Sequence, residues 1–487
     1  MTLSAAVNLT QMTTSVVRTR IAPAPSGSIH VGNARAALYN WLFSRQNQGV
    51  FVLRIEDTDQ KRADEAAYGA IVEDLEWLGL TWDEGPFLQS KRAEHYASAA
   101  ERLVEMGSAY RCYCTPEELD TRRKAAMAAG RPPGYDGRCR YLSAEERAAF
   151  EAEGRTFALR FRVPENRTIA FDDVVRGPVV TDTAQISDFV IQRSDGGPTY
   201  MLAVTVDDLE MDITHVIRGE DLLASTPRQI LIREALGVTD VPVFAHLPLL
   251  VSSDGRPLSK RWGDVSVRAY RDAGFLPEAM VNYLALLGWS FDDKTNIFSV
   301  EELVEKFSLE RVGKNPAAFD VVKLEWLNGI YIKQLEPSDL AERLVPFCVR
   351  AGIDADSESG RRLLVAVAPL ISERLKRLDE APSMIRFLFG PVTLDEKASK
   401  TIQGQAEYLR AVADRLAALP GWTGPQIEAA LRELAAERFL KPKQAFQPIR
   451  AAVTGTLISP PLFESLEILG KDTSIDRLMA APQSVVV

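Results

Sequence analysis

The chain has 487 residues and a formal net charge of −10, with 57 Lys and Arg against 67 Asp and Glu. Hydrophobic residues make up 46% and charged residues 25%, which is typical of a globular protein and excludes a disordered or collagen-like chain. The acidic balance argues against a basic protein that coats nucleic acid or an anionic membrane, but it leaves local basic patches open.

The N-terminal residues 1–15 contain neither a basic residue nor a long apolar run, so we interpret them as a short loose extension. We expect no membrane span, because no apolar run reaches the required length of about 18 residues. Four cysteines are too few for a disulfide scaffold, which favours a reducing cytoplasm.

A strand, a loop, a helix and a second strand are predicted in that order from residue 16 to residue 55. The apolar run 16–21 predicts the first strand, and two prolines and a glycine within 22–27 end it. Apolar spacing predicts a helix over 31–46, and 50–55 reads as the next strand. This order is the building unit of a parallel α/β sheet.

A segment rich in turns and charge, residues 108–198, interrupts this alternation, with short strands at 157–163 and 189–192. Alternation then returns, with strands predicted at 200–206, 215–218 and 243–251 and a helix at 227–236. We therefore expect one parallel sheet that is split by an inserted α+β subdomain.

Strand signals vanish after about residue 335, and helical spacing appears at 339–349, 361–378, 406–419 and 425–439. The chain is therefore expected to end in an all-α region. The expected divisions are 1–15, 16–107, 108–198, 199–255, 256–335 and 336–487.

Three short motifs carry residue types suited to binding a nucleotide and an amino acid. His30-Val31-Gly32-Asn33 begins the first helix, where free backbone N–H groups attract phosphate. The acidic run from Arg54 to Asp59 follows a strand end, where it could hold a cation or an ammonium group. The run from Pro257 to Arg261 offers Lys260 and Arg261 to phosphate charge. Each motif alone also fits a plain structural interpretation, namely a helix cap, a solvated acidic turn and a charged surface turn.

Together these motifs resemble the HIGH and KMSKS signatures of class I aminoacyl-tRNA synthetases, and most closely those of bacterial glutamyl-tRNA synthetases. Further strings share the resemblance, which runs from about residue 18 to the end: Arg20-Ile21-Ala22-Pro23, Thr214-His215-Val216-Ile217-Arg218-Gly219-Glu220-Asp221, Trp326-Leu327-Asn328-Gly329 and Gln447-Pro448-Ile449-Arg450. The resemblance implies a Rossmann-like catalytic domain, an inserted subdomain that binds the acceptor stem, a helical stem-contact region and a helical anticodon-binding region. It also implies that glutamate is activated with ATP and Mg²⁺ and then transferred to tRNA(Glu) by a monomeric, cytoplasmic enzyme.

The resemblance assigns roles to individual residues. The implied glutamate-binding residues are Arg20, Ala22, Glu56, Tyr200 and Arg218, with the two arginines on the carboxylates and Glu56 on the ammonium. Guanidinium suits this task because it meets a carboxylate through two parallel hydrogen bonds. The implied ATP-binding residues are His30, Gly32, Asn33, Ser259, Lys260 and Arg261, of which His30 and Lys260 are expected to be catalytic.

Two positions depart from the family pattern. Ala24 stands where the family loop usually has a serine, which removes a hydroxyl near the amino acid. Pro257 stands where the second signature usually begins with lysine, a charge that Arg256 could supply.

The insertion contains Cys112 and Cys114, followed 25 residues later by Cys139. Some family members bind Zn²⁺ at such a set, with a fourth ligand either four residues before or two residues after the last cysteine. Here these places hold Tyr135 and Tyr141, and the sequence leaves the choice open, as it does ordinary free thiols. His95 and His246 are expected to be structural.

In the helical region, candidate tRNA-binding residues are Arg374, Lys441, Lys443 and Arg450, each of which also fits a solvated face. By resemblance, Arg374 is the residue that rejects tRNA(Gln).

The sequence allows four alternatives to a tRNA(Glu)-specific enzyme to be compared. A glutaminyl enzyme would carry C-terminal β-barrels, and the short enzyme that glutamylates queuosine lacks an anticodon region, so the helical C-terminus argues against both. A non-discriminating enzyme that also charges tRNA(Gln), or a catalytically impaired RNA-binding homologue, stays open.

Overall fold

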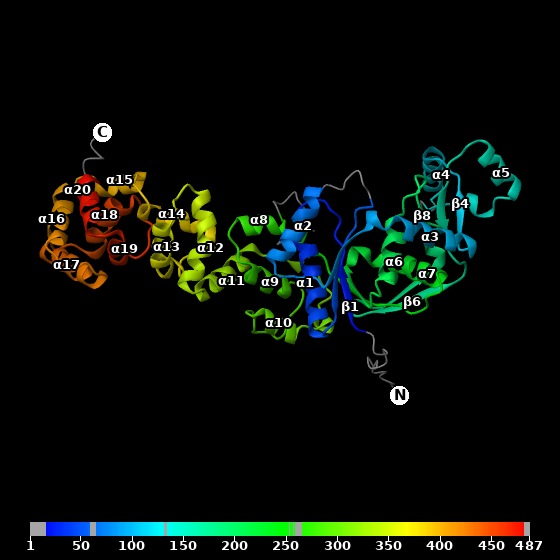
Figure 1. Ribbon diagram of the computed structural model, residues 1–487, viewed down its shortest axis with the longest axis horizontal. Coiled ribbons are helices and arrows are strands. Elements are labelled where there is room, and N and C mark those ends of the chain that lie inside the picture. Colours follow the sequence, from blue (N-terminus) through cyan, green and yellow to red (C-terminus); the bar gives the residue numbers. More distant parts are fainter. Residues whose placement is uncertain are drawn as a thin grey trace, which may run out of the picture. The chain divides into compact units, whose positions relative to one another are not determined.

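The computed structural model describes residues 16–58, 65–130, 134–252, 254–256, 258 and 265–481 (Figure 1). It divides into two compact units. The first contains the chain up to Ala269 together with Val281–Asp320, and the second contains Tyr270–Met280 and Val321–Val487.

The first unit begins with alternating strands and helices: β1 (Arg18–Ile21), α1 (Val31–Gln46), β2 (Val50–Ile55), α2 (Glu65–Trp77) and β3 (Glu84–Leu88). The three strands pair in parallel in the order β1-β2-β3. The strand, helix and strand expected over residues 16–55 are thus present. Most side chains of α1 are buried, because the helix lies against both β1 and β9.

A three-stranded antiparallel sheet forms the core of the inserted segment. The strands are β4 (Ala109–Cys112), β5 (Ala158–Phe161) and β8 (Val190–Gln192), in the order β4-β5-β8. Helix α3 (Ala93–Glu105) precedes the segment, and α4 (Pro116–Ala128) and α5 (Ala144–Ala152) lie within it. The N-termini of α4 and α5 are determined by local sequence, because Thr115 and Ser143 each form a capping box with a glutamate three residues later.

The second large sheet has the order β7-β6-β10-β9 and consists of β6 (Thr168–Asp173), β7 (Gly177–Asp182), β9 (His215–Gly219) and β10 (Val243–Leu247). Strands β9, β10 and β6 are parallel. This sheet adjoins the first where the amide of Thr214 donates to the carbonyl of Arg18, at 3.0 Å. The expected single sheet is therefore two sheets that meet at β1 and β9, and the hairpin β6-β7, which lies inside the expected insertion, extends the second of them.

The strand predicted at residues 200–206 is wrong: this run is the first part of helix α6 (Tyr200–Glu210). A short apolar run does not distinguish a buried strand from a buried helix. Both faces of α6 are buried, so no polar stripe revealed the helical period. The remaining elements up to residue 320 are α7 (Thr226–Ala235), β11 (Leu250–Val251), α8 (Val267–Asp272), α9 (Pro277–Leu286), α10 (Val300–Lys306) and β12 (Ala317–Ala318).

Helices follow between residues 321 and 481: α11 (Val321–Gln334), α12 (Pro337–Arg350), α13 (Glu358–Ile371), α14 (Ala381–Ile385), α15 (Glu396–Ile402), α16 (Ala406–Ala417), α17 (Gly424–Glu437), α18 (Pro442–Thr454), α19 (Leu462–Leu469) and α20 (Lys471–Ala480). Among the described residues no strand follows β12, which agrees with the expected all-α region. Two apolar cores hold these helices together, one centred on α12 and α13 and one on α16 to α20. No helix within the described ranges is long and apolar enough to cross a membrane.

Candidate active site

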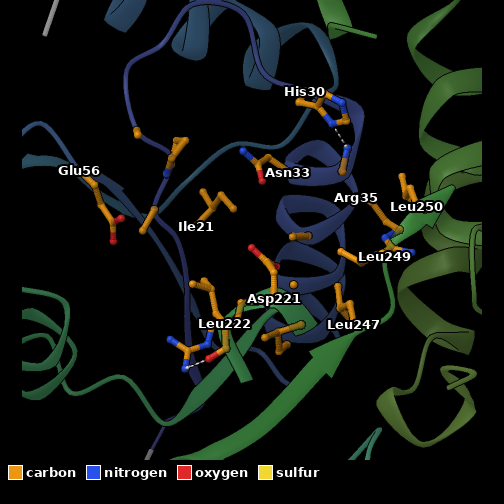
Figure 2. Close-up of a pocket in the computed structure, with 18 of the residues that line it drawn as sticks. Ile21, His30, Asn33, Arg35, Glu56, Asp221, Leu222, Leu247, Leu249 and Leu250 are labelled. Atoms are coloured by element: carbon orange, nitrogen blue, oxygen red, sulfur yellow. Dashed lines mark hydrogen bonds between the residues drawn. The ribbon is translucent and has the colours of Figure 1, made fainter. Parts of the chain in front are cut away.

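A cavity of about 470 Å³ opens in the first unit where β1, β2 and β9 end beside the N-terminus of α1 (Figure 2). The carboxyl ends of parallel strands are the usual binding edge of an open α/β sheet. The cavity brings together eight of the residues that the sequence indicated: Arg20, Ala22, His30, Gly32, Asn33, Glu56, Tyr200 and Arg218. Ala24, which stands in place of the family serine, also lines it.

His30 caps the first helix of the cavity wall. Its Nδ1 accepts a hydrogen bond from the amide of Gly32 at 3.1 Å, so the neutral ring carries its proton on Nε2. A Cβ atom at Gly32 would lie 3.3 Å from that Nδ1 and would press on the ring. Glycine therefore lets the histidine cap the helix and adds no side chain beside the ring. The first two amides of the helix are used within the protein, because Val31 donates to the carbonyl of Val265 and Gly32 donates to His30.

Arg20 forms an ion pair with Asp208, a residue that the sequence analysis did not identify. Its Nε and Nη2 donate to the two carboxylate oxygens of Asp208 at 3.2 and 3.3 Å. Asp208 also accepts from Nη1 of the fully buried Arg54 at 2.8 Å. Burial would raise the pKa of Asp208, but the charges of both arginines lower it to about 2, so this carboxylate is ionised.

Glu56 lies at the end of β2 and faces the cavity (Figure 2). Burial raises its pKa, and this effect is opposed by Arg54, whose Nη2 lies 3.5 Å from Oε1, and by Arg20. With only 16% of its side chain exposed, Glu56 is a poorly hydrated acid that a substrate cation would stabilise.

Arg218 projects from β9 and is 5% exposed. Its Nε donates to Nε2 of His246 at 3.1 Å, and its Nη2 donates to Thr226 Oγ1 and Gln229 Oε1, both at 2.9 Å. Its Nη1 is buried and has no hydrogen-bond partner among the described residues. A buried guanidinium donor without a partner is unfavourable by itself, and this nitrogen is therefore suited to a ligand carboxylate.

The predicted phosphate-binding residues Ser259, Lys260 and Arg261 lie outside the described residues, as do Pro257 and Asp59. Leu258 is described and lines the cavity, and its amide donates to the carbonyl of Leu250 at 3.2 Å.

The three cysteines of the insertion come together, with their sulfur atoms within 4.8 Å of one another. Tyr135 completes the group: its hydroxyl oxygen lies 3.5 Å from Cys112 Sγ and 3.9 Å from Cys114 Sγ. Cys114 Sγ lies 3.5 Å from Cys139 Sγ, close to the separation of about 3.8 Å that Zn–S bonds of about 2.3 Å set in a tetrahedron. Tyr141 is 72% exposed and donates to Glu165 instead. The geometry therefore favours Tyr135 over Tyr141 as the fourth group.

Two of the four candidate tRNA-binding residues meet in the helical unit. Nη1 of Arg374 and Nη1 of Arg450 both donate to the carbonyl of Ser459, at 2.6 and 3.2 Å. Neither guanidinium forms an ion pair with a carboxylate in the part of the chain that the structure describes, so two cations lie together without a counter-charge. Lys441 and Lys443 are exposed at the start of α18, the helix that carries Arg450.

Two buried residues of the site were missed by the sequence analysis: Asp208 beneath the cavity and Asp173 behind Arg218. Arg54 was named only as the start of the acidic run, and His246 was expected to be structural. The adjacent acids Asp207 and Asp208, in an otherwise apolar run, were a usable signal, because charges in such a run are buried only when they are paired. The pairing of Asp173 with His246, 73 residues away, has no local signal.

Comparisons with known proteins agree with this architecture. Residues 16–326 match the family model of the class I tRNA synthetase (E and Q) catalytic domain, and residues 339–482 match an anticodon-binding domain. A glutamate–tRNA ligase of Geobacter sulfurreducens is 46% identical, with 96% of this chain and 98% of the relative covered. One of Carboxydothermus hydrogenoformans is 44% identical over 95% and 99% of the two chains.

Among solved structures, a glutamate tRNA ligase of Elizabethkingia meningosepticum in complex with its amino acid superposes with a TM-score of 0.85. The two proteins are 32% identical, and the match covers 97% of this chain and 100% of the other. These matches confirm the α/β fold expected for the catalytic part and the helical C-terminal region. The chain therefore belongs to the class I tRNA synthetases, in the family of the glutamate–tRNA ligases.

Proposed function

We propose that this protein attaches glutamate to tRNA(Glu). In the first step an oxygen of the α-carboxylate attacks the α-phosphorus of ATP, the bond to the β-phosphate bridge breaks, and pyrophosphate leaves. In the second step a hydroxyl of the tRNA's terminal adenosine attacks the activated carbonyl carbon, and AMP leaves. One observation supports this reaction above all: a single cavity combines cationic donors, a buried acid and the histidine-capped start of a helix.

The glutamate half of the cavity has Arg20 and Arg218 for the two carboxylates and Glu56 for the ammonium group. The Tyr200 hydroxyl, whose pKa is raised by burial, stays protonated and can donate to the substrate. Ala22, a small residue beside Arg20, leaves room for the substrate chain.

The nucleotide half is the first turn of α1. The side chains of His30 and Asn33 can donate to phosphate oxygens, Gly32 leaves room for the nucleotide beside them, and Mg²⁺ arrives with ATP. We assign Ser259, Lys260 and Arg261 to the same phosphates, with Lys260 stabilising the leaving pyrophosphate.

ATP–pyrophosphate exchange in the presence of glutamate and tRNA tests this proposal. We expect exchange with the parent enzyme, and a fall of about 30-fold or more in kcat/KM for glutamate with Glu56→Gln, because a charged contact is lost. Glu101→Gln, on the exposed face of α3, is the matched control and should leave exchange unchanged. A well-folded parent without exchange would instead favour the catalytically impaired homologue.

We further propose that Cys112, Cys114, Cys139 and Tyr135 bind one Zn²⁺, which would tie β4 to the 134–139 segment. Arg160 supports a negatively charged ligand set, since its Nε lies 3.3 Å from Cys112 Sγ and its guanidinium carbon lies 3.8 Å from the centre of the Tyr135 ring. The purified parent should carry one zinc per chain. Tyr135→Phe should weaken zinc retention against a chelator, whereas Tyr141→Phe should not, and a parent without zinc overturns the assignment.

For tRNA recognition we propose that the pair Arg374 and Arg450 contacts the anticodon arm, with Lys441 and Lys443 on nearby phosphates. Arg374→Gln should raise charging of tRNA(Gln) relative to tRNA(Glu), which both tRNAs assayed side by side would measure. Arg410→Gln, exposed on α16, is the control. Equal charging of both tRNAs by the parent would show a non-discriminating enzyme. We place the protein in the cytoplasm, in line with its four free cysteines, and we expect a monomer from the resemblance to the family.

A further inference from the structure

Three buried polar residues line up across the second sheet behind the cavity. Asp173 ends β6, His246 lies on β10 and Arg218 lies on β9. The parallel register places His246 directly beside Arg218, and β6 is the next strand on the other side of β10. All three are buried, with exposed fractions of 2%, 0% and 5%. Neighbouring strands therefore bring an acid, an imidazole and a guanidinium into one row.

The hydrogen bonds along this row determine which nitrogen of His246 carries the proton. Oδ2 of Asp173 lies 2.6 Å from Nδ1 of His246. Nε2 of His246 faces Nε of Arg218, which can only donate, so Nε2 must be the unprotonated acceptor and Nδ1 must donate to Asp173. Thr226 Oγ1, at 3.2 Å from Nε2, can donate to the same nitrogen.

The carboxylate of Asp173 is itself held in place. Its Oδ1 accepts from the amides of Val175 and Arg176 at 3.0 and 2.8 Å. Burial would raise the pKa of Asp173, but its bonds to His246 and to these amides keep the pKa low, so the residue stays ionised. An ionised Asp173 favours the Nδ1–H form of the ring, as in other Asp–His pairs.

Two of the three guanidinium nitrogens of Arg218 are thereby fixed: Nε by His246, and Nη2 by Thr226 and Gln229. The third, Nη1, has no partner among the described residues, and Arg218 lines the cavity. We propose that Asp173 and His246 are positioning residues that keep Arg218 oriented with Nη1 available to a carboxylate of glutamate. This inference rests on the glutamate-binding role proposed for Arg218.

Two substitutions at His246 separate positioning from packing. The amide of glutamine reaches the place of Nε2, so His246→Gln can still accept from Arg218. The shorter asparagine reaches only the place of Nδ1, so His246→Asn keeps a contact with Asp173 and loses the one with Arg218. We expect His246→Asn to raise KM for glutamate by about 10-fold or more and His246→Gln by less than about 3-fold, with KM for ATP within about twofold of the parent in both.

Asp173→Asn is an independent test, because its effect depends on the histidine proton. The side-chain oxygen of asparagine is expected to stay with the amides of Val175 and Arg176. Its NH₂ group would then donate to Nδ1 of His246, which moves the ring proton to Nε2, opposite the N–H of Arg218. We expect a rise in KM for glutamate similar to that of His246→Asn, with kcat less affected.

The experiment measures KM for glutamate and for ATP by tRNA-dependent pyrophosphate exchange, with melting temperatures for all variants. His95→Asn, on the exposed surface of α3, is the matched histidine control. Equal increases for His246→Asn and His246→Gln, or an unchanged KM for glutamate in His246→Asn and Asp173→Asn, overturn the inference. If a His246 variant does not fold, Asp173→Asn and Thr226→Val decide the outcome, the latter because it removes the hydroxyl that contacts both Arg218 and His246. An unchanged KM for glutamate in both variants overturns the inference. Arg218→Lys separates the two proposals: an unchanged KM for glutamate in this variant refutes the binding role of Arg218 itself.

Discussion

Replacing Asp208 with asparagine perturbs the charge network beneath the cavity with little change of shape. The carboxylate is 5% exposed and receives three hydrogen bonds, two from Arg20 and one from Arg54. Asparagine keeps one acceptor oxygen but removes the negative charge. Among the described residues, Arg54 then keeps ion pairs with Asp207 and Glu56, each at 3.5 Å, and Arg20 loses the carboxylate with which it pairs.

The loss of folding stability can be derived from the pKa of Asp208 and from the cost of breaking a buried ion pair. Burial opposes ionisation of Asp208, yet Arg20 and Arg54 lower its pKa from 3.8 to about 2. At about 1.4 kcal/mol per tenfold change in acidity, this corresponds to about 2.4 kcal/mol of folding stability. Removing one partner of a buried ion pair typically costs about 3–5 kcal/mol. Because asparagine retains one acceptor, we expect Asp208→Asn to lower the free energy of unfolding by about 2–4 kcal/mol at pH 7.

The pH dependence follows from the direction of the pKa change. Because the folded-state pKa lies below the unfolded value, the contribution of Asp208 is complete above about pH 5 and is lost as the pH falls through 3.8 towards 2. The comparison at pH 7 therefore measures the full contribution.

Urea unfolding followed by tryptophan fluorescence measures the stability change, and pyrophosphate exchange measures KM for glutamate, which should rise because Arg20 is no longer held. Glu101→Gln serves again as the exposed control. If Asp208→Asn unfolds within about 0.5 kcal/mol of the parent and binds glutamate equally well, Asp208 does not support Arg20 and the reasoning fails.

Three further changes test other parts of the molecule. Burial lowers the pKa of His215 from 6.5 to about 4, so the folded state resists protonation and its free energy of unfolding should fall by about 2 kcal/mol between pH 8 and pH 5. In urea unfolding His215→Phe should reduce this pH dependence, and the same pH dependence in the variant and the parent would contradict the prediction. Gly32→Ala places a Cβ atom against the His30 ring, so KM for ATP should rise while KM for glutamate changes little. A rise in KM for glutamate with an unchanged KM for ATP would refute the ATP-binding role of the start of α1. Leu409→Ala opens a cavity in the fully buried core of α16 to α20 and should cost about 2–5 kcal/mol by calorimetry; a loss below about 1 kcal/mol would mean that this core is loosely packed.

Much of the cavity could be predicted from the sequence because its signals are local. His30, Gly32 and Asn33 form one helix start, and Glu56 directly follows a strand, so a short window contains both the residue and the backbone geometry that orients it. Arg20 lies within the first strand, and its role came from the resemblance to the family. The helical end of the chain was predictable for the same reason, since each helix shows its own apolar period. The run 200–206 was predicted wrongly because burial on all sides removed that period.

The sequence by itself therefore determined the fold class, the family motifs and eight of the residues that line the cavity, because short segments of the chain carry these signals. The tertiary structure decided what required distances between remote residues. It placed the hydroxyl of Tyr135 beside the sulfur atom of Cys112 and that of Tyr141 beside Glu165. It also showed which nitrogen of Arg218 has no partner among the described residues, because that follows from bonds to His246, Thr226 and Gln229, which strand pairing and helix packing bring together.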